Sequence, residues 1–197
     1  MGKKFSLFLA AAAVLAFAIP ALANAAPVTN ASGGIAKAST TTANASTVVG
    51  TSTNVETTSA TLGTLKCTHV EVIAWLTKNT TTEVEATHDE GTTNSATNCT
   101  AGGASVEITD PTITVLKSTK SGSGTVSLDF TLPKVGCSFS GTVPFTYTPG
   151  GSSIHIAGHL LPSKKACGTE TETEIHGDFT ISGREAPTSP FAVWKLD

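Results

Sequence analysis

The stretch TVSLDFTL, residues 125–132, decides the fold class because apolar and polar side chains alternate along it without a break. Successive side chains of a β-strand point to opposite faces of a sheet, so this pattern predicts a strand with one buried and one solvated face. The same alternation returns in residues 139–147, 154–160 and 175–181. Each of these segments is therefore also predicted to be a half-buried strand.

Turn-forming residues separate these segments and complete the fold prediction. Glycine, proline and serine are dense in SGSG (121–124) and TPGG (148–151), as in turns that join antiparallel strands. The segment HVEVIAWL, residues 69–76, is apolar on both faces, which indicates a strand covered on both sides. No helical periodicity follows the first 25 residues. The chain is therefore predicted to be all-β, as an antiparallel β-sandwich or a jelly-roll-like or barrel-like single domain.

The four cysteines are an even number, which in an exported chain indicates disulfides. Sequence alone does not decide among the possible pairings. We expect Cys67 to pair with Cys99 and Cys137 with Cys167, because pairing neighbours along a series of hairpins closes short loops. A zinc site is the less favoured alternative, since the cysteines include no C-x-x-C spacing.

The N-terminal residues have the three-part layout of a signal peptide. Lys3 and Lys4 precede an apolar run that ends in small residues, and cleavage is expected after Ala23 or, preferably, after Ala25. A membrane anchor is the alternative, but Pro20 and the small-residue site favour a cleaved peptide over residues 1–25. No second apolar stretch of spanning length follows, so the cleaved chain is predicted to be secreted, with no membrane span.

Residues 26–47 are rich in threonine, alanine and serine and contain little apolar bulk. Such a segment cannot offset its ordering entropy by burial, so it is predicted to be a flexible linker, a spacer or a carrier of O-linked sugar. The β domain is expected to follow it, over residues 48–197.

The charge balance argues against one class of partner. Lys3 and Lys4 are the only charged residues of the predicted signal peptide, so cleavage would change the net charge from −3 to −5. The single arginine, Arg184, and the mildly acidic balance cannot form the basic stripe that neutralises phosphates. Nucleic-acid binding is therefore not expected.

The arrangement of NCTAGGASVEITDP (98–111), VGCSFSGTVPFTYTPGGSSIHIAG (135–158) and a final cysteine before IHGDFTISG (175–183) resembles a group of proteins. These are uncharacterised small secreted cysteine-containing β-proteins encoded by soil bacteria. The likeness covers about residues 48–194. It implies a secreted β fold and carries no assigned activity.

Histidines and acids gather on the expected outer face of the last long hairpin. Antiparallel pairing would place His159 opposite Glu174 and His155 opposite Asp178. Imidazole and carboxylate groups from adjacent strands can bind Zn²⁺ or Cu²⁺, but a solvated polar face is the favoured interpretation because no dense ligand motif is present. The weak metal candidates are His155, His159, Glu174 and His176.

Aromatic side chains are few, and three of them are candidates for a ligand platform. A carbohydrate-binding or polymer-binding module would need Trp75, Tyr147 or Trp194 to stand exposed. Polysaccharides and envelope proteins are therefore the partners considered.

Catalytic signatures are missing from the sequence. It contains no G-x-S-x-G, no S-x-x-K, no phosphate-binding G-x-x-x-x-G-K-[ST] and no dinucleotide motif, so no catalytic residue and no cofactor are assigned. The expected function is a secreted, non-enzymatic binding or cell-envelope protein. A carbohydrate-binding module and, less favoured, a secreted hydrolase are the alternatives.

Overall fold

The structure is a computed structural model that describes residues 28–29, 36–41, 44–60, 62–80, 83–88, 93–119, 122–163, 167, 171–186 and 189–196. The predicted signal peptide, residues 1–25, lies outside the described residues. No helix in this part of the chain is long and apolar enough to cross a membrane.

The described chain is built from antiparallel strands, which confirms the all-β prediction. The strands are β1 (Val28–Thr29), β2 (Thr47–Ser52), β3 (Val55–Ser59), β4 (Gly63–Asn79), β5 (Glu83–His88), β6 (Ser95–Ala101), β7 (Ala104–Val106), β8 (Thr109–Thr119), β9 (Ser123–Leu132), β10 (Cys137–Tyr147), β11 (Ser153–Pro162), β12 (Thr173–Arg184), β13 (Ala192–Val193) and β14 (Lys195–Leu196).

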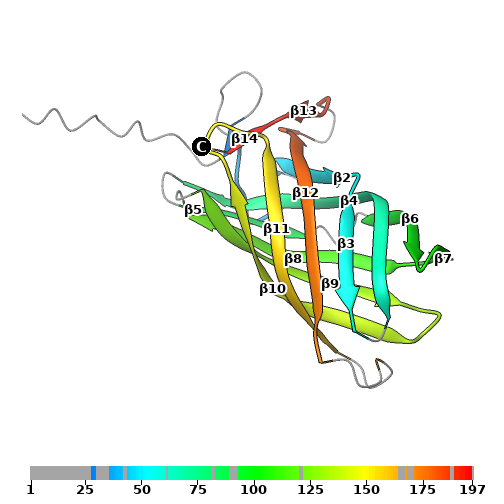
Figure 1. Ribbon diagram of the computed structural model, residues 1–197. Helices are drawn as coiled ribbons and strands as arrows, with labels where there is room; N and C mark the ends of the chain where they lie inside the picture. Colours follow the sequence, from blue (N-terminus) through cyan, green and yellow to red (C-terminus); the bar gives the residue numbers. More distant parts are fainter. Residues whose placement is uncertain are drawn as a thin grey trace, which may run out of the picture.

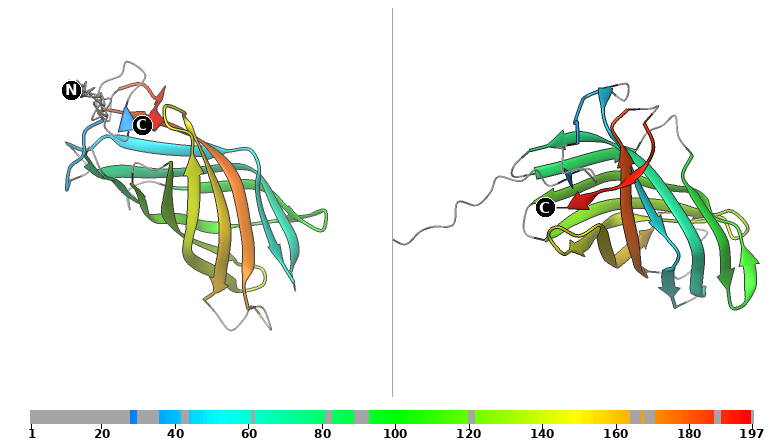
Figure 2. Two further views of the ribbon diagram at one scale, coloured as in Figure 1. Left: turned by 60° about the vertical axis from the view of Figure 1, so that its left-hand side comes forward. Right: turned by 90° about the horizontal axis from the view of Figure 1, so that it is seen from above.

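The main sheet closes on itself and is barrel-like. Its strands follow the order β12, β11, β10, β9, β8, β5 and β4, and β2 and β3 join β4 back to β12. Strands on opposite sides of such a sheet cross because each is tilted, and Figure 1 and Figure 2 show β11 and β12 crossing β8 at a steep angle. Of the architectures expected from the sequence, the strand pairings give the barrel-like one.

Strand β4 is the longest element, and each of its edges pairs with two shorter strands placed end to end. One edge pairs with β3 and then β2, and the other pairs with β6 and then β5. Both edges of the central part of HVEVIAWL are thereby paired, and only one of its faces is buried, since the outward Ile73 and Trp75 are half-exposed.

The core lies inside the closed sheet and is formed by the parity that the sequence predicts. In β9 the inward Val126 and Phe130 are 0% and 7% exposed. The inward residues of β10, β11 and β12 are likewise buried, including Val143, Ile156 and Phe179. Alternation along each strand therefore separates an apolar interior from a polar outer surface.

One end of the sheet is covered by segments from both ends of the described chain. Strand β1 pairs with β14 in a separate two-stranded sheet, and Val28 and Leu196 are both buried. Asn79 Nδ2 donates hydrogen bonds to the carbonyl oxygens of Val28 (3.1 Å) and Ala36 (2.8 Å). Ser46, the last described residue before β2, is also fully buried.

This packing differs from the flexible linker predicted for residues 26–47. The described residues of that segment obtain their order from contacts with distant parts of the chain, because β1 pairs with the C-terminal β14 and Asn79 holds it from β4. Composition measures only the apolar content of the segment itself, so it could not reveal a docking site elsewhere in the chain.

Both disulfides form as predicted. Cys67 is bonded to Cys99 and links β4 directly to β6, and Cys137 is bonded to Cys167 and links the start of β10 to the connection between β11 and β12. All four sulfur-bearing residues are buried. Neighbouring hairpins are therefore joined without a crossing of the sheet.

Candidate functional site

The interior of the closed sheet is incompletely filled and contains two adjoining apolar cavities. Core side chains normally pack at crystal-like density and leave few voids larger than a water molecule. The larger cavity here has a volume of about 70 Å³ and the smaller one about 50 Å³. This interior is the candidate functional site, because barrel-like interiors are common places for small ligands.

The larger cavity lies among β3, β4, β9 and β12. Inward valine, leucine, isoleucine and phenylalanine side chains form most of its wall, together with the disulfide-bonded Cys67. The smaller cavity lies toward the end covered by β1 and β14, since Val28 and Leu196 are among its lining residues. Three residues border both cavities and separate them: Val72, Ile156 and Phe179.

Two inward glycines help to leave this space. Gly50 borders the smaller cavity, and a Cβ atom there would lie 3.2 Å from Val72 Cγ2 and 3.5 Å from Phe179 Cδ1. Gly177 borders the larger cavity, and a Cβ atom there would lie 3.1 Å from Val55 Cγ2. A larger residue at either position would have to displace side chains that line the cavities.

Polar groups at the cavities are few. In the smaller cavity, Ser118 Oγ donates a hydrogen bond to the carbonyl oxygen of Ser123 (2.9 Å) and lies 3.2 Å from the Tyr147 hydroxyl. In the larger cavity, Thr57 is a lining residue that is only 8% exposed.

Two further polar residues border the larger cavity, but their positions alternate with inward residues. His176 lies between the inward Ile175 and Gly177, and its Nε2 atom is 3.9 Å from Glu56 Oε2. Asp129 lies between Leu128 and Phe130 on β9. The side-chain chemistry of the interior is therefore almost entirely apolar.

The wall beside the larger cavity has an interrupted ladder, which we call the seam. Strand β5 pairs only with the C-terminal half of β8, and the N-terminal half of β8 has no partner on that edge in the described structure. Strand β6 pairs there with β4 and β7 but not with β8. Figure 1 shows the β6–β7 hairpin projecting at this side of the sheet. The partly buried residues Ala96, Ile108 and Leu128 line the cavity here. The larger cavity thus reaches a part of the wall that backbone hydrogen bonds do not close.

The platform prediction is wrong for two of its three aromatic residues. Trp194 is only 1% exposed, and it packs on Gly183, where a Cβ atom would lie 2.6 Å from the indole ring. Tyr147 is buried beside Phe145, with ring centroids 6.3 Å apart. Trp75 is partly exposed on the outer face of β4, but its indole nitrogen is buried. Tyr147 and Trp194 are core residues and not parts of an exposed platform.

The predicted register of the last long hairpin is confirmed. His155 lies opposite Asp178, with Nδ1 2.7 Å from Oδ1, and His159 lies opposite Glu174. His159 Nδ1 is instead 3.7 Å from the Glu172 carboxylate. The two histidines thus form separate pairs with acids on an exposed face.

A neighbouring ion pair extends this outer face to β3 and β4. Glu56 lies 2.8 Å from Lys66 Nζ, and this hydrogen bond holds the pKa of the Glu56 carboxyl below its ordinary value. His176 approaches the same carboxylate. Within the described ranges, no three histidine, cysteine or acidic side chains converge to hold a metal ion. The candidates His155, His159, Glu174 and His176 are therefore distributed along the face.

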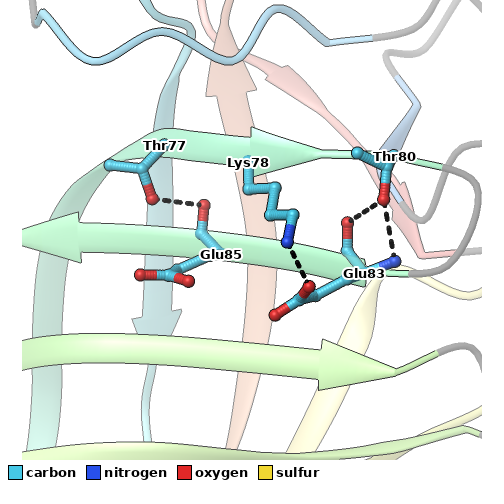
Figure 3. A network of polar contacts seen from close by, with 5 residues as sticks. All are labelled: Thr77, Lys78, Thr80, Glu83 and Glu85. Atoms are coloured by element: carbon cyan, nitrogen blue, oxygen red, sulfur yellow. Dashed lines mark hydrogen bonds and ion pairs between the residues drawn. The ribbon is translucent and has the colours of Figure 1, made fainter.

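A second polar network lies at the end of the β4–β5 hairpin (Figure 3). Lys78 Nζ donates to Glu83 Oε2, and this bond raises the pKa of Lys78. Thr80 Oγ1 donates to the Glu83 carbonyl oxygen (3.1 Å), and Thr77 Oγ1 donates to that of Glu85 (3.2 Å). These bonds satisfy the hairpin end and connect to neither cavity, so we assign the network a structural role.

Sequence reasoning did not identify the cavities or Thr57. The available signal was the shared parity of Val55, Thr57 and Ser59 on β3, which places a threonine on the inward face. Inward glycine at 177 was visible too, between Ile175 and Phe179. Neither pattern tells whether neighbouring side chains fill the space, because that depends on residues from distant strands.

Comparisons with known proteins give no relative for this chain. No family model, no curated protein and no solved structure matches it.

Proposed function

We propose that this chain is a secreted, non-enzymatic binding protein whose barrel-like interior takes up a small apolar molecule. The observation that carries the proposal is the pair of adjoining apolar cavities, of about 70 and 50 Å³, inside the closed sheet. An engineered apolar cavity of about 150 Å³ stays dry and binds benzene or xenon. Each cavity here has at most about half of that volume, so the occupant would be smaller than benzene, such as a xenon atom, or the narrow end of a longer apolar molecule.

Energetics support a binding role for the space. Residual cavity volume costs roughly 24 cal/mol per Å³, so a void of the size of the larger cavity costs on the order of 2 kcal/mol. Gly50 and Gly177 preserve this space at inward positions, where a larger side chain would meet cavity-lining residues. A ligand that fills the void recovers part of that free energy.

The disulfides support the proposed compartment, and two features of the structure disfavour the alternative functions. Two disulfides fit an oxidising extracellular environment. The carbohydrate-binding alternative requires an exposed aromatic platform, and the burial of Tyr147 and Trp194 removes two of its candidates. The hydrolase alternative requires paired titratable groups in a pocket, whereas the walls of both cavities are mainly aliphatic and aromatic.

The test is xenon binding to the oxidised protein, followed by methyl NMR. We expect saturable shifts of methyl groups in Val72 and Ile156, which border both cavities. Ala86→Leu should remove the response of the smaller cavity, because Ala86 lines it and the added carbons occupy its volume. Ala157→Leu, at an exposed position of β11, is the matched control and should leave the response unchanged. Wild-type protein without any saturable shift would refute the proposal.

A further inference from the structure

The two cavities end at different parts of the sheet, and this order gives a ligand its direction of entry. The smaller cavity ends beneath β1 and β14, where Val28 and Leu196 are 3% and 6% exposed. The larger cavity reaches the seam, where the half-buried Ala96, Ile108 and Leu128 form its wall. Figure 1 shows β14 and the β6–β7 hairpin well apart on the sheet. Entry at the seam therefore leads first into the larger cavity and then toward the smaller one.

The passage between the cavities is narrow. Val72 from β4, Ile156 from β11 and Phe179 from β12 border both cavities and form the constriction between them. Each cavity alone has at most about half of the volume that holds benzene, whereas the two together approach that volume. A ring or a branched group would have to fit its whole width into one cavity. An unbranched alkyl chain is equally narrow along its length, so it can occupy both.

Charges at the larger cavity restrict the other end of such a ligand. Asp129 borders this cavity from β9, and the exposed Glu107 precedes Ile108 at the seam. No lysine or arginine is among the described residues that line either cavity. A carboxylate or phosphate at the seam would therefore approach like charges, which is unfavourable. The end of the ligand at the seam should be neutral.

We infer that the interior takes up the unbranched alkyl chain of a neutral molecule, which enters at the seam, fills the larger cavity and places its end in the smaller one. The chain passes between Val72, Ile156 and Phe179, and these side chains border empty space on both sides into which they can shift. This inference rests on the proposed function, because it names the shape and the charge of the molecule that the apolar interior binds.

The experiment measures dissociation constants of straight-chain alcohols, from 1-propanol to 1-hexanol, by methyl NMR of the oxidised protein. Leu65 reports the larger cavity and Val84 the smaller one, because each is a lining residue of that cavity alone. We expect short alcohols to shift the Leu65 signals and only the longer ones to shift those of Val84. Each added methylene should tighten binding about fourfold until the chain end fills the smaller cavity.

Two matched probes test the shape and the charge of the ligand. The isomer 3,3-dimethyl-1-butanol has the same atoms as 1-hexanol but a wide, branched end that cannot pass the constriction. It should bind wild-type protein about tenfold more weakly than 1-hexanol, because about two methylene equivalents remain outside the smaller cavity. Hexanoate at neutral pH carries a charged end on a straight chain, and it should also bind about tenfold more weakly than 1-hexanol.

Three variants test whether the chain end reaches the smaller cavity. Ala86→Leu fills that cavity, so it should remove the gain from longer chains and leave 1-propanol binding within about twofold of wild type. Gly50→Ala adds one methyl group beside the same cavity and should reduce the gain in part, which keeps the test available if Ala86→Leu does not fold. Ala157→Leu, at an exposed position of β11, is the control and should reproduce the wild-type series.

The outcomes separate this inference from the proposed function. If xenon binds but 1-hexanol does not, or if the branched isomer binds as tightly as 1-hexanol, the inference is wrong and the apolar binding function stands. An unchanged chain-length series in the folded variants at Ala86 or Gly50 would contradict it as well, and hexanoate binding as tight as that of 1-hexanol would overturn the neutral end. If neither xenon nor any alcohol binds wild-type protein in a saturable way, both proposals are wrong.

Discussion

Substitution of Phe179 by alanine should join the two cavities into one. Phe179 lies on the inward face of β12, is 6% exposed and borders both cavities. Replacing a buried phenylalanine by alanine costs about 3–5 kcal/mol of unfolding free energy. Phe179 already faces empty space on two sides, so its ring makes fewer van der Waals contacts than a fully packed ring. We therefore expect a cost near the lower end, about 3 kcal/mol.

The measurement is thermal and urea unfolding of oxidised Phe179→Ala beside Phe139→Ala. A loss of 1 kcal/mol lowers the Tm by about 2–4 °C in a domain of this size, so Phe179→Ala should lower it by about 6–12 °C. Phe139 is 1% exposed, lines neither cavity and packs 5.4 Å from the Phe130 ring centre. Its removal should cost more, near 5 kcal/mol.

The joined cavity should also gain a ligand. Its volume would approach or exceed the roughly 150 Å³ that holds benzene in an engineered core. Benzene at 100 times its dissociation constant should then restore about 2.7 kcal/mol to Phe179→Ala and much less to the wild type. The reasoning is refuted if Phe179→Ala costs as much as Phe139→Ala, or if benzene stabilises wild type and Phe179→Ala equally.

Three further perturbations test the elements around the site. Replacing Cys67 and Cys99 together by alanine opens a loop with a sequence separation of 32. Chain entropy predicts that the free energy of unfolding, measured in urea without reductant, falls by about 4 kcal/mol. A fall of less than about 1 kcal/mol would contradict that expectation. Because Lys66 lowers the pKa of Glu56, the pair stabilises the fold above the ordinary carboxyl pKa and this contribution disappears as the pH falls through the lowered pKa. Lys66→Met should therefore be less stable than wild type at neutral pH and low salt, and the two should converge in acid; a difference that is independent of pH would argue against the ion pair. Asn79→Ala removes both hydrogen bonds from Asn79 to the N-terminal segment. Amide hydrogen exchange should therefore become faster in β1 and stay slow in β9 and β10. Unchanged exchange in β1 would show that β14 alone holds this strand in place.

Much of the strand structure could be predicted because it depends on local periodicity. The parity of Val126 and Phe130 assigns their faces, since side-chain direction in a strand alternates with a period of two. The same rule fixes which residues of β11 and β12 are outward, and a short connection then brings His155 opposite Asp178. Chain proximity only favoured the cysteine pairs among the possible pairings, and the structure contains the favoured ones.

What the sequence could not supply is how distant segments share space. Residues 28–46 contain little apolar bulk, and part of them is ordered only because β14 and Asn79 provide partners from elsewhere in the chain. Trp194 is a surface candidate by position and a core residue in the structure, because Gly183 lacks the Cβ atom that would exclude its ring.

The sequence by itself thus determined the all-β class and the faces of the long strands, both of which follow from neighbouring residues, whereas it favoured one disulfide pairing without deciding it. Only the tertiary structure decided that β2 and β3 close the sheet between β4 and β12 and that the enclosed side chains leave two cavities. Whether an inward residue such as Phe179 meets neighbouring side chains or empty space depends on the summed volumes of side chains from several strands. Volume is a property of the whole packed interior, and no local pattern along the chain encodes it.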